Sequence, residues 1–341
     1  MLNYAKFSGR RMFDMDQLTY PISQRENALA TIGHGKPAYL GTTVNMIFPR
    51  EIKDNVARGF VRDGLPFDPV TQAGGADMFG ISWVYEPAVR GSMVMPGKPL
   101  LEEVAQWREK LPLPDLEAID WEAVRQRCAP LVSRTELNAT MVFTGYFERL
   151  ISLMDFENAA MAMVDEDCEE ELHALFAALT EYYIALFEKL RTYCAIDMIT
   201  FHDDWGHQLS SFFSADTCRE LLLPYIKRIV EACHQNGMLF DLHCCGKVEK
   251  LVPLMVEASI DKWDGQSIND LWGLLDRYGD RLCITLTEKI PQMEPQAAEQ
   301  WADGILARLS PLGGKNMYLP ARGLCPTARE ALARKSIAFY G

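Results

Sequence analysis

Eight short apolar segments, separated by stretches with helical periodicity, constrain most strongly what this chain can fold into. Most are largely apolar and end in turn or polar residues, which is typical of strands buried on both faces. They lie at 38–48, 76–85, 139–147, 196–206, 237–246, 259–266, 281–290 and 315–323. Because strands that alternate with helices form parallel sheets, the pattern predicts an α/β fold, a (β/α)8 barrel of the TIM type.

The stretches between these segments carry helix signals. The clearest runs from Asp165 to Cys194, with an acidic start and an apolar stripe. The next begins after Ser214, a good N-cap, and ends at Gly237, and Pro224 should kink it. Further helices are expected at 14–31, 248–258, 271–278, 295–309 and 327–339. An open doubly wound sheet would need a GxGxxG or Walker phosphate loop, and the sequence has neither.

We expect one barrel domain over residues 1–341, in which 1–36 form an N-terminal helical extension. Residues 86–137 are rich in proline, with Pro87, Pro96, Pro99, Pro112 and Pro114 among them, and are expected to make an excursion over the barrel. The N-terminus lacks the apolar segment of a signal peptide, which predicts a cytoplasmic protein. The sequence leaves the oligomeric state open, a homo-oligomer included.

Charge and cysteine content narrow the class of partner. The net charge is −13 and basic residues occur only in scattered pairs, which argues against nucleic acid and against an anionic membrane surface. No apolar stretch approaches the length of a membrane span. The nine cysteines are odd in number and lack the spacing of a disulfide framework. We therefore expect mostly free, buried thiols.

In a barrel of this class, chemistry is located at the C-terminal ends of the strands. Polar and reactive side chains gather at those positions in the later strands: Tyr146, Glu148, Asp203, Asp204, Trp205, Gln208, Trp263, Gln266, Asn269, Glu288, Arg322 and Cys325. Of these, Asp203, Asp204 and Glu148 are the candidate catalytic residues. The candidate substrate-binding residues are Tyr146, Trp205, Gln208, Trp263, Gln266 and Asn269. The aromatic members are equally compatible with simple packing at the top of the barrel.

The segment FDLHCCGKVEKL, residues 240–251, carries the most specific signal. It fits a redox pair, a metal site or core packing. Strand alternation places His243 and Cys245 on one face and Cys244 on the other, which disfavours a disulfide and suits a shared metal ion such as Zn²⁺. Gly246 permits a turn, and a helix starting near Lys247 should lower the pKa of the thiol.

Other metal ligands must come from neighbouring strands. Cys325 is the best-placed cysteine, and Glu288 and Asp264 are carboxylates within reach, whereas Cys283 lies at the wrong end of its strand. Asp203 and Asp204 are adjacent, so one should face the mouth, where it could handle protons, and the other should cap a loop. An N-cap beside a solvated neighbour explains the pair equally well.

Several segments together resemble the uroporphyrinogen decarboxylase superfamily, and most closely its corrinoid-dependent methyltransferase branch. They are TGYFERL, DDWGHQ, SADTCRELLLPYIKRIVEACHQNG, LHCCGKVEKLVPLMVEASID and WDGQSIND. The resemblance spans about Thr135 to the C-terminus and implies a (β/α)8 barrel. It also implies that His243 and Cys245 bind zinc with a later cysteine. Arg322 aligns nearest to that cysteine, so either Cys325 or Glu288 would complete the site.

The resemblance implies a methyltransferase that uses zinc and a corrinoid (cobalamin). The corrinoid would be carried by a partner protein, because the chain shows no cobalamin-binding domain. The expected substrate is a small methylated molecule, such as a methoxylated one, and the direction of transfer stays open. Uroporphyrinogen decarboxylation is disfavoured because Arg50 stands alone where several arginines bind the substrate carboxylates. The alternatives are a metal-free decarboxylase or lyase and a non-catalytic barrel that binds a tetrapyrrole or a partner.

Overall fold

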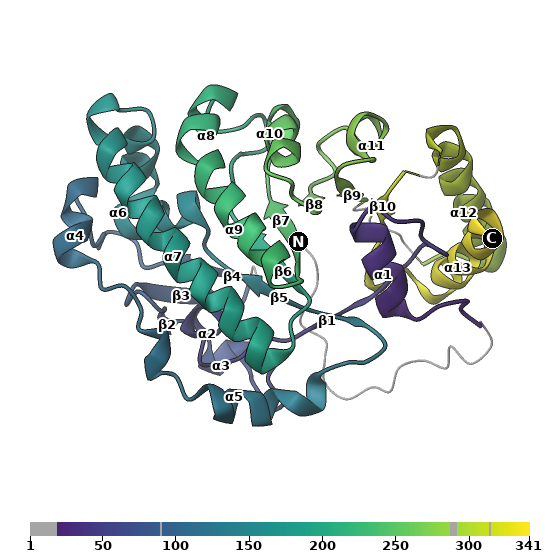
Figure 1. The fold of residues 1–341 in the computed structure, drawn as a ribbon, viewed down its shortest axis with the longest axis horizontal. Coiled ribbons are helices and arrows are strands. Elements are labelled where there is room, and N and C mark those ends of the chain that lie inside the picture. Colours follow the sequence, from purple (N-terminus) through teal and green to yellow (C-terminus); the bar gives the residue numbers. More distant parts are fainter. Residues whose placement is uncertain (1–18, 89–90, 287–291, 314) are drawn as a thin grey trace.

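The chain folds around a curled parallel sheet with helices on its outer side (Figure 1). The computed structural model describes residues 19–88, 91–286, 292–313 and 315–341. Seven strands pair in the order β1-β5-β6-β7-β8-β9-β10. They are β1 (Val44–Met46), β5 (Leu137–Val142), β6 (Met198–His202), β7 (Leu239–Cys244), β8 (Lys262–Gly265), β9 (Cys283–Thr285) and β10 (Met317–Tyr318). Because all seven are parallel, their C-terminal ends meet on one side of the fold.

The helices cover the convex side of this sheet. The longest, α7, lies beside α9 in Figure 1, and α12 packs on α13 at the other end of the molecule. The α-helices are α1 (Gln24–Ile32), α2 (Lys53–Arg58), α3 (Pro69–Gln72), α4 (Trp107–Lys110), α5 (Trp121–Cys128), α6 (Tyr146–Ala162), α7 (Glu169–Cys194), α8 (Ala215–Leu221), α9 (Leu223–Gln235), α10 (Val252–Glu257), α11 (Leu271–Tyr278), α12 (Pro295–Leu309) and α13 (Pro326–Tyr340). The 3₁₀ turns are η1 (Val104–Gln106), η2 (Leu116–Ala118), η3 (Ala129–Leu131), η4 (Glu166–Cys168), η5 (Glu249–Leu251), η6 (Ser310–Leu312) and η7 (Ala321–Gly323).

The helix signals in the sequence act as expected. Ser214 accepts a hydrogen bond from the Thr217 N–H at the start of α8. Leu222 interrupts the helix just before Pro224, so that α8 and α9 are separate helices. Gly237 then has a φ of +65°, the left-handed conformation in which glycine commonly ends a helix. Of the helix expected at 14–31, residues up to 18 lie outside the described residues.

A second, antiparallel sheet takes the segment that the sequence suggested as the second barrel strand. It consists of β2 (Gly75–Ala76), β3 (Ser82–Glu86) and β4 (Gly91–Val94). Exposed and buried residues alternate along most of β3, as in a sheet with one solvated face. Trp83 is buried, whereas Val84 is exposed. The α/β barrel class is confirmed, but β1 pairs directly with β5 and the parallel sheet has seven strands.

The first and last parallel strands meet through the segments that flank them. Thr42, just before β1, accepts a hydrogen bond from the Ala321 N–H at 3.0 Å. It also accepts one from the Tyr318 hydroxyl at 3.4 Å. The curl is therefore joined at this seam by single hydrogen bonds, and β1 and β10 do not form a strand ladder.

The excursion expected at 86–137 runs along the outside of α7. Near the start of α7, the Trp107 indole N–H donates a hydrogen bond to Glu171. Near its end, the Trp121 ring stacks on Tyr193 with centroids 5.7 Å apart. Buried aromatic residues at both ends thus fix this segment to the long helix.

The inside of the curl is layered, because every second residue of each strand points inward. The lowest layer is apolar: Leu137, Ala139, Met198, Cys283 and Tyr318 pack against Ala28 and Ile32 of α1. Above it Asp241 binds Lys262 at 2.7 Å and accepts a hydrogen bond from Thr200. The uppermost layer, at the C-terminal ends of the strands, contains His202, His243 and Asp264.

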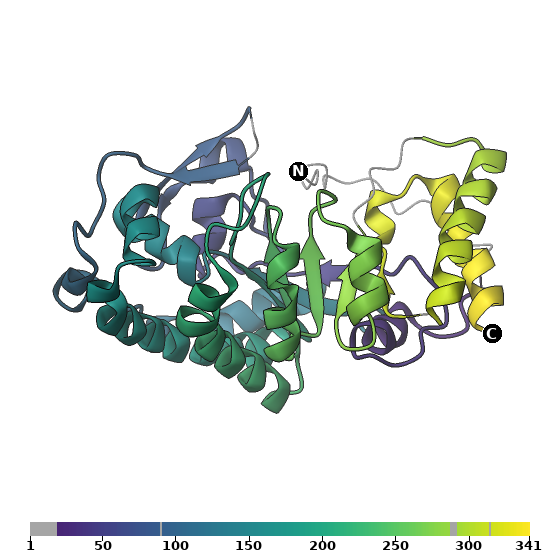
Figure 2. The same cartoon turned by 90° about the horizontal axis from the view of Figure 1, so that it is seen from above.

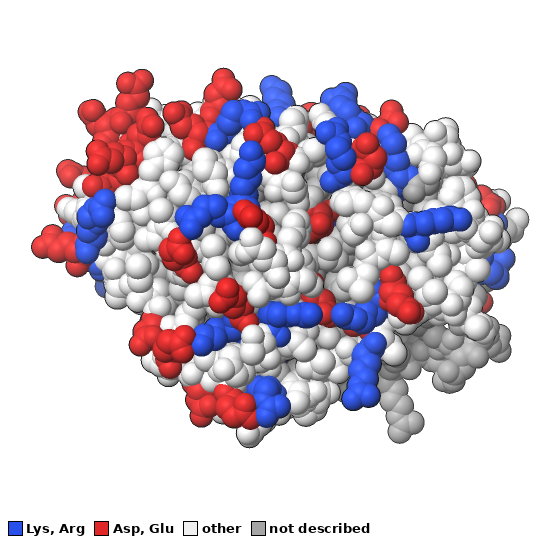
Figure 3. All heavy atoms as spheres, viewed as in Figure 1, with Lys and Arg blue, Asp and Glu red and all other residues white. Residues whose placement is uncertain are grey.

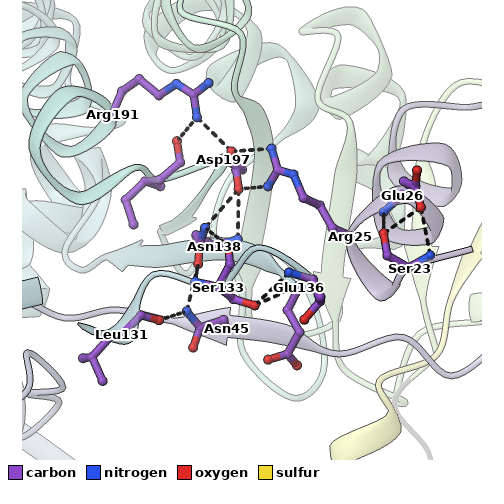
Figure 4. Close-up of polar contacts among 12 residues, drawn as sticks. Ser23, Arg25, Glu26, Asn45, Leu131, Ser133, Glu136, Asn138, Arg191 and Asp197 are labelled. Carbon is purple, nitrogen blue, oxygen red and sulfur yellow. Dashed lines mark hydrogen bonds and ion pairs between the residues drawn. The ribbon is translucent and has the colours of Figure 1, made fainter. Parts of the chain in front are cut away.

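At the opposite, N-terminal end of the strands, one carboxylate joins several elements (Figure 4). Asp197 pairs with Arg25 of α1 and, at 2.8 Å, with Arg191 of α7. It also accepts a hydrogen bond from the Asn138 N–H of β5. This end of the fold is closed by structural contacts, so a site must be sought at the other end.

No described helix has the length and apolarity of a membrane span. Acidic side chains gather at the upper left of Figure 3, where Figure 1 shows the ends of α6 and the start of α7. Elsewhere on that face acidic and basic side chains are interspersed, in keeping with the net charge of −13.

Candidate metal centre

Two histidines lie side by side at the C-terminal ends of neighbouring strands. His202 of β6 and His243 of β7 are register partners, and His243 is in turn the register partner of Asp264 on β8. The two imidazole rings stack with centroids 4.7 Å apart and an interplanar angle of 22°. Parallel pairing of two strands that each carry a histidine at or next to the C-terminal end therefore brings the rings together.

A carboxylate holds each of these rings by the same nitrogen. His202 Nδ1 lies 2.8 Å from Oε2 of Glu148, in the first turn of α6. His243 Nδ1 lies 2.9 Å from Oδ2 of Asp264. This carboxylate–imidazole arrangement fixes the ring and leaves Nε2 as the nitrogen free to bind a metal.

A carboxylate and a thiol lie beside the two rings. One ligand atom from each of His202, Asp204 and His243 lies within 4.8 Å of the others. Cys245 Sγ is 3.4 Å from His243 Nε2, and the Cys245 N–H donates to Oδ1 of Asp204 at 2.6 Å. The cluster thus offers two imidazole nitrogens, a carboxylate and a thiol.

Two glycines bring the loops after β6 and β7 together. Gly246 has a φ of +93°, and a Cβ there would lie 2.3 Å from the backbone of Gly206. The Gly246 N–H also donates to Gln266. Asn269 accepts hydrogen bonds from the backbone of the β7 loop and donates to the Gly246 carbonyl. Gln266 and Asn269 therefore secure the loop that carries Cys245.

Electrostatics keep both supporting carboxylates ionised. Burial raises the pKa of Glu148, but the His202 imidazole and the Arg58 charge outweigh it and hold that pKa at about 2. Burial likewise opposes ionisation of Asp264, and Lys262 and His243 bring its pKa to about 2. For His243, burial disfavours the charged ring, yet Asp264 and Cys245 raise its pKa well above the ordinary value.

The expectation that a helix lowers the pKa of the Cys245 thiol is wrong. The first turn, η5, starts only at Glu249, and the N–H groups of Val248 and Glu249 donate to Asn269 instead. Burial raises the pKa of Cys245, and the contact with His243 does not cancel that effect. A bound metal would be needed to hold this thiol as thiolate at neutral pH.

Cys244 points away from the cluster, as strand alternation predicts. It is fully buried in the main hydrophobic core and accepts a hydrogen bond from the Trp205 N–H. Cys283, which was expected at the wrong end of its strand, packs in the apolar lowest layer of the curl.

The adjacent aspartates have different roles. Asp204 faces the histidines, whereas Asp203 is fully buried and accepts hydrogen bonds from the N–H groups of Phe147 and Glu148 at the start of α6. The Trp205 indole donates to it as well. Burial raises the pKa of Asp203 to about 7, although the hydrogen bonds from these donors act to lower it. Asp203 thus positions Glu148, and Asp204 is the member of the pair available for chemistry.

The three predicted substrate-binding aromatic residues all lie in the core. Tyr146 is fully buried and contacts Thr180 through its hydroxyl at 2.8 Å. Trp263 is also fully buried and packs in the main core with Leu242, on the outward face of the sheet. Trp205 is 3% exposed. Gln208 is exposed in the loop after β6. These three aromatic residues support the site and do not line it.

Cys325 does not join the cluster. It precedes α13, and its Sγ lies 3.3 Å from the Thr327 hydroxyl. Among the described residues the metal-capable group consists of His202, Asp204 and His243. It contains neither Cys325 nor Cys245, but Cys245 Sγ lies 3.4 Å from His243 Nε2. The other proposed ligand, Glu288, lies outside the described residues, and the side chain of Arg322 is not described.

His202 is the functional candidate that sequence reasoning missed. A usable signal was present, because His202 and Asp204 have the same i, i+2 spacing at a strand end as His243 and Cys245. Residues at that spacing point to the same face of a strand. Two such pairs on adjacent parallel strands would have suggested one shared site.

Residues 76–285 match the family model of uroporphyrinogen decarboxylase (URO-D), which covers more than half of the chain. The chain belongs to the uroporphyrinogen decarboxylase family. The match includes the whole candidate centre, from Glu148 to Asp264. No protein of curated function matches the sequence.

A solved methyltransferase structure shares the fold of this chain. A methyltransferase from Methanosarcina mazei is 16% identical with a TM-score of 0.62, and the match covers 94% of this chain and 100% of that one. A xylose isomerase-like TIM barrel protein from Mycobacterium smegmatis is 12% identical over 70% of this chain and 88% of that one, with a TM-score of 0.36. At 16% identity, the likeness to the Methanosarcina mazei methyltransferase describes the fold alone.

The donor set fits zinc. Zn²⁺ takes imidazole nitrogen, thiolate and carboxylate oxygen in tetrahedral sites. His202, Asp204 and His243 supply imidazole nitrogen and carboxylate oxygen, and the Cys245 thiol lies beside His243. Carboxylates already hold both imidazoles by Nδ1. His202, His243, Asp204 and Cys245 are therefore the residues that would hold the ion.

Proposed function

We propose that this protein is a zinc-dependent methyltransferase that moves a methyl group between a small methylated substrate and a corrinoid carried by a partner protein. The observation that carries the proposal is the pair of carboxylate-held imidazoles facing Asp204 and Cys245. Membership of the uroporphyrinogen decarboxylase family and the shared fold with a methyltransferase support it.

Zinc would act as a Lewis acid on an ether oxygen or would hold a thiol as thiolate near neutral pH. The chain's own residues prepare that step. Glu148 and Asp264 keep Nε2 of each histidine directed at the shared site, and Asp203 fixes the start of α6 that carries Glu148. Beneath them, Lys262 keeps Asp264 ionised.

Decarboxylation of a porphyrinogen is poorly supported by the arginines of this chain. That substrate carries many carboxylates and needs several free, fixed cations. Arg50, the arginine nearest to the expected binding segment, already forms a two-point ion pair with Asp63, at 2.5 Å and 2.9 Å. Its guanidinium is therefore already paired with a carboxylate of the protein.

Metal analysis of the purified protein tests the metal part of the proposal. We expect about one zinc ion per chain, as in mononuclear sites of this donor set. His243→Ala and Cys245→Ala should lose the ion. His207→Ala is the matched control, because His207 is an exposed histidine in the loop after β6. Zinc retained in both ligand variants would rule out the site.

Methyl transfer itself is tested with cob(I)alamin and a panel of methoxylated and methylthio compounds. We expect loss of the cob(I)alamin absorbance with at least one donor and none with His243→Ala. Release of carbon dioxide from a cyclic carboxylate by metal-free protein would instead indicate a decarboxylase. Tight corrinoid binding without transfer to or from any compound would indicate a non-catalytic binding protein.

A further inference from the structure

The second half of α6 and the turn after it expose large apolar side chains to solvent. Phe156 is 47% exposed, Met161 61% and Val164 59%. The Val164 N–H donates a hydrogen bond to the Met161 carbonyl at 3.0 Å, and side chains at this spacing lie on one face. Exposed apolar side chains that cluster in this way are typical of a surface that binds a partner.

A break in the backbone separates this part of α6 from the part that carries Glu148. Asp155 has a φ of +64° and a ψ of 165°, which interrupts the helix. Residues other than glycine rarely adopt such a conformation, and those that do are concentrated in functional segments. The direction of residues 156–162 is therefore set separately from that of the helix start that supports the metal centre.

Acidic side chains border the apolar face. Between Arg149 and Lys189 the sequence contains ten acidic residues and neither lysine nor arginine. Figure 3 shows acidic side chains gathered at the upper left, where Figure 1 shows α6 and the start of α7. One of them, Glu157, is exposed one helical turn before Met161, on the same face. The apolar side chains therefore lie in a strongly negative environment.

Most of these carboxylates have no cation beside them in the part of the chain that the structure describes. Glu171 pairs with Arg108 at 3.0 Å. Glu157, Glu166 and Glu170 are exposed, and none of them belongs to an ion pair among the described residues. The dipole of α7 favours acidic residues in its first turn, yet it does not require the apolar side chains beside them to be exposed.

The charge of this surface determines what can cover it. The described side chains that could hold a metal ion are His202, Asp204 and His243, at the strand ends, and not these carboxylates. An anionic membrane or a nucleic acid would be repelled. The complementary surface is therefore that of a protein with basic residues around an apolar centre.

The exposed face adjoins the candidate metal centre through aromatic contacts. The centroid of the Phe156 ring lies 5.2 Å from that of Phe212, in the loop after β6, and 6.2 Å from that of Phe147. Phe147 precedes Glu148, which holds the His202 ring. A partner on this face would therefore contact a side chain that packs against both the loop after β6 and the start of α6.

We propose that residues 156–170 form a docking surface for a partner protein whose contact face has an apolar centre surrounded by basic residues. Burial of Phe156, Met161 and Val164 would supply most of the affinity, and charge pairs with the carboxylates would steer the partner to the surface. The inference does not rest on the proposed function, because docking requires neither zinc nor turnover.

Synthetic peptides test the chemistry of this surface. The fluorescently labelled probes are a lysine–leucine amphipathic helix, a lysine–glutamine peptide of equal charge and a glutamate–leucine amphipathic helix. Fluorescence anisotropy should show that the lysine–leucine helix binds about 10-fold or more tightly than either other peptide, because it alone has both features. Added salt should weaken this binding. Hydrogen exchange of the complex should show protection within residues 156–170.

Two double variants locate the binding. Met161→Ser with Val164→Ser should weaken binding of the lysine–leucine helix about 10-fold or more, through loss of apolar burial. Glu166→Gln with Glu170→Gln should weaken it about 3-fold or more at low salt, through loss of exposed charge pairs. All four side chains are exposed, so we expect the fold to tolerate both changes, which thermal unfolding checks.

Glu294→Gln with Glu330→Gln is the matched control. Both side chains are exposed, and neither belongs to an ion pair among the described residues. Glu294 occupies the N-cap of α12 and Glu330 belongs to α13, at the opposite end of the molecule from α6 (Figures 1 and 2). This variant loses the same charge and should bind the lysine–leucine helix like the wild type.

Three outcomes would overturn the docking surface: no preference for the lysine–leucine helix, a preference unchanged in both folded double variants, or protection outside residues 156–170. Sedimentation tests whether a second copy of the chain is the occupant. A wild-type dimer that Met161→Ser with Val164→Ser dissociates would replace the basic partner by a second copy. Failure of methyl transfer with intact peptide binding would contradict the proposed function alone.

Discussion

Imidazole orientation decides what the residues at the top of the sheet can bind. His202 and His243 each give Nδ1 to a carboxylate, so their Nε2 atoms remain for a metal shared with Asp204. Burial, by contrast, raises the pKa of the Cys245 thiol above its ordinary value. The ligand set that we propose differs from the one that the family resemblance implies, because it contains His202 and lacks Cys325.

Zinc affinity distinguishes the two ligand sets. We expect His202→Ala to weaken zinc binding by more than about 10-fold, because removal of a ligand exceeds the effect of removing an outer-shell partner. Cys325→Ala should bind zinc like the wild type. Competition with a chromophoric chelator measures both affinities. Zinc binding lost in Cys325→Ala and kept in His202→Ala would restore the set of His243, Cys245 and Cys325.

At the scale of elements, the start of α6 is fitted tightly against β6. Gly145 precedes the helix, and a Cβ there would lie 2.5 Å from the Cβ of Asp203 and 2.7 Å from the Phe201 ring. This close approach lets Asp203 bind the first N–H groups of α6. It also places Glu148 against His202, so the helix start is part of the site's support.

Gly145→Ala should therefore destabilise the fold by about 1–3 kcal/mol, the range for overpacking a close-packed site. Gly304→Ala is the matched control, since Gly304 lies in α12 with open space around its missing Cβ. That change should stabilise the protein by up to about 1 kcal/mol through helix propensity. Urea unfolding followed by circular dichroism gives both free energies. Equal effects of the two substitutions would contradict the close-approach argument.

At the scale of the whole molecule, the C-terminal ends of the strands carry the candidate site, and their N-terminal ends carry structural contacts. The N-terminal end is closed by α1 and by the Asp197 network of Figure 4, which joins α1, α7 and β5. Burial alone would raise the pKa of Asp197, but Arg25, the Asn138 N–H and Arg191 lower it below its ordinary value. A carboxylate whose pKa is lower in the folded state stabilises the fold when it is ionised.

Asp197→Asn should lower the free energy of unfolding at pH 7 by about 2 kcal/mol, through loss of charge-assisted hydrogen bonds. The stabilisation by Asp197 is complete above its unfolded pKa of about 4 and is lost as the pH falls through the lower, folded value. The difference between wild type and variant should therefore shrink below about pH 4. Urea unfolding at pH 7 and pH 3 measures it. A difference that stays constant with pH would contradict the role of the ionised carboxylate.

The sequence by itself determined the features that depend on local periodicity. Apolar runs and helix caps placed most strands of the parallel sheet and the break before Pro224, and strand alternation separated Cys244 from His243 and Cys245. These follow from backbone geometry within one element, which neighbouring residues specify.

The tertiary structure alone decided which elements are neighbours. It placed 76–85 in an antiparallel sheet, paired β1 with β5, put Trp263 in the core and left Cys325 apart from the histidines. It also joined His202 to His243 across neighbouring strands. The physical reason is that a metal site is defined by side chains from several strands, whose register and loops no single stretch of sequence encodes.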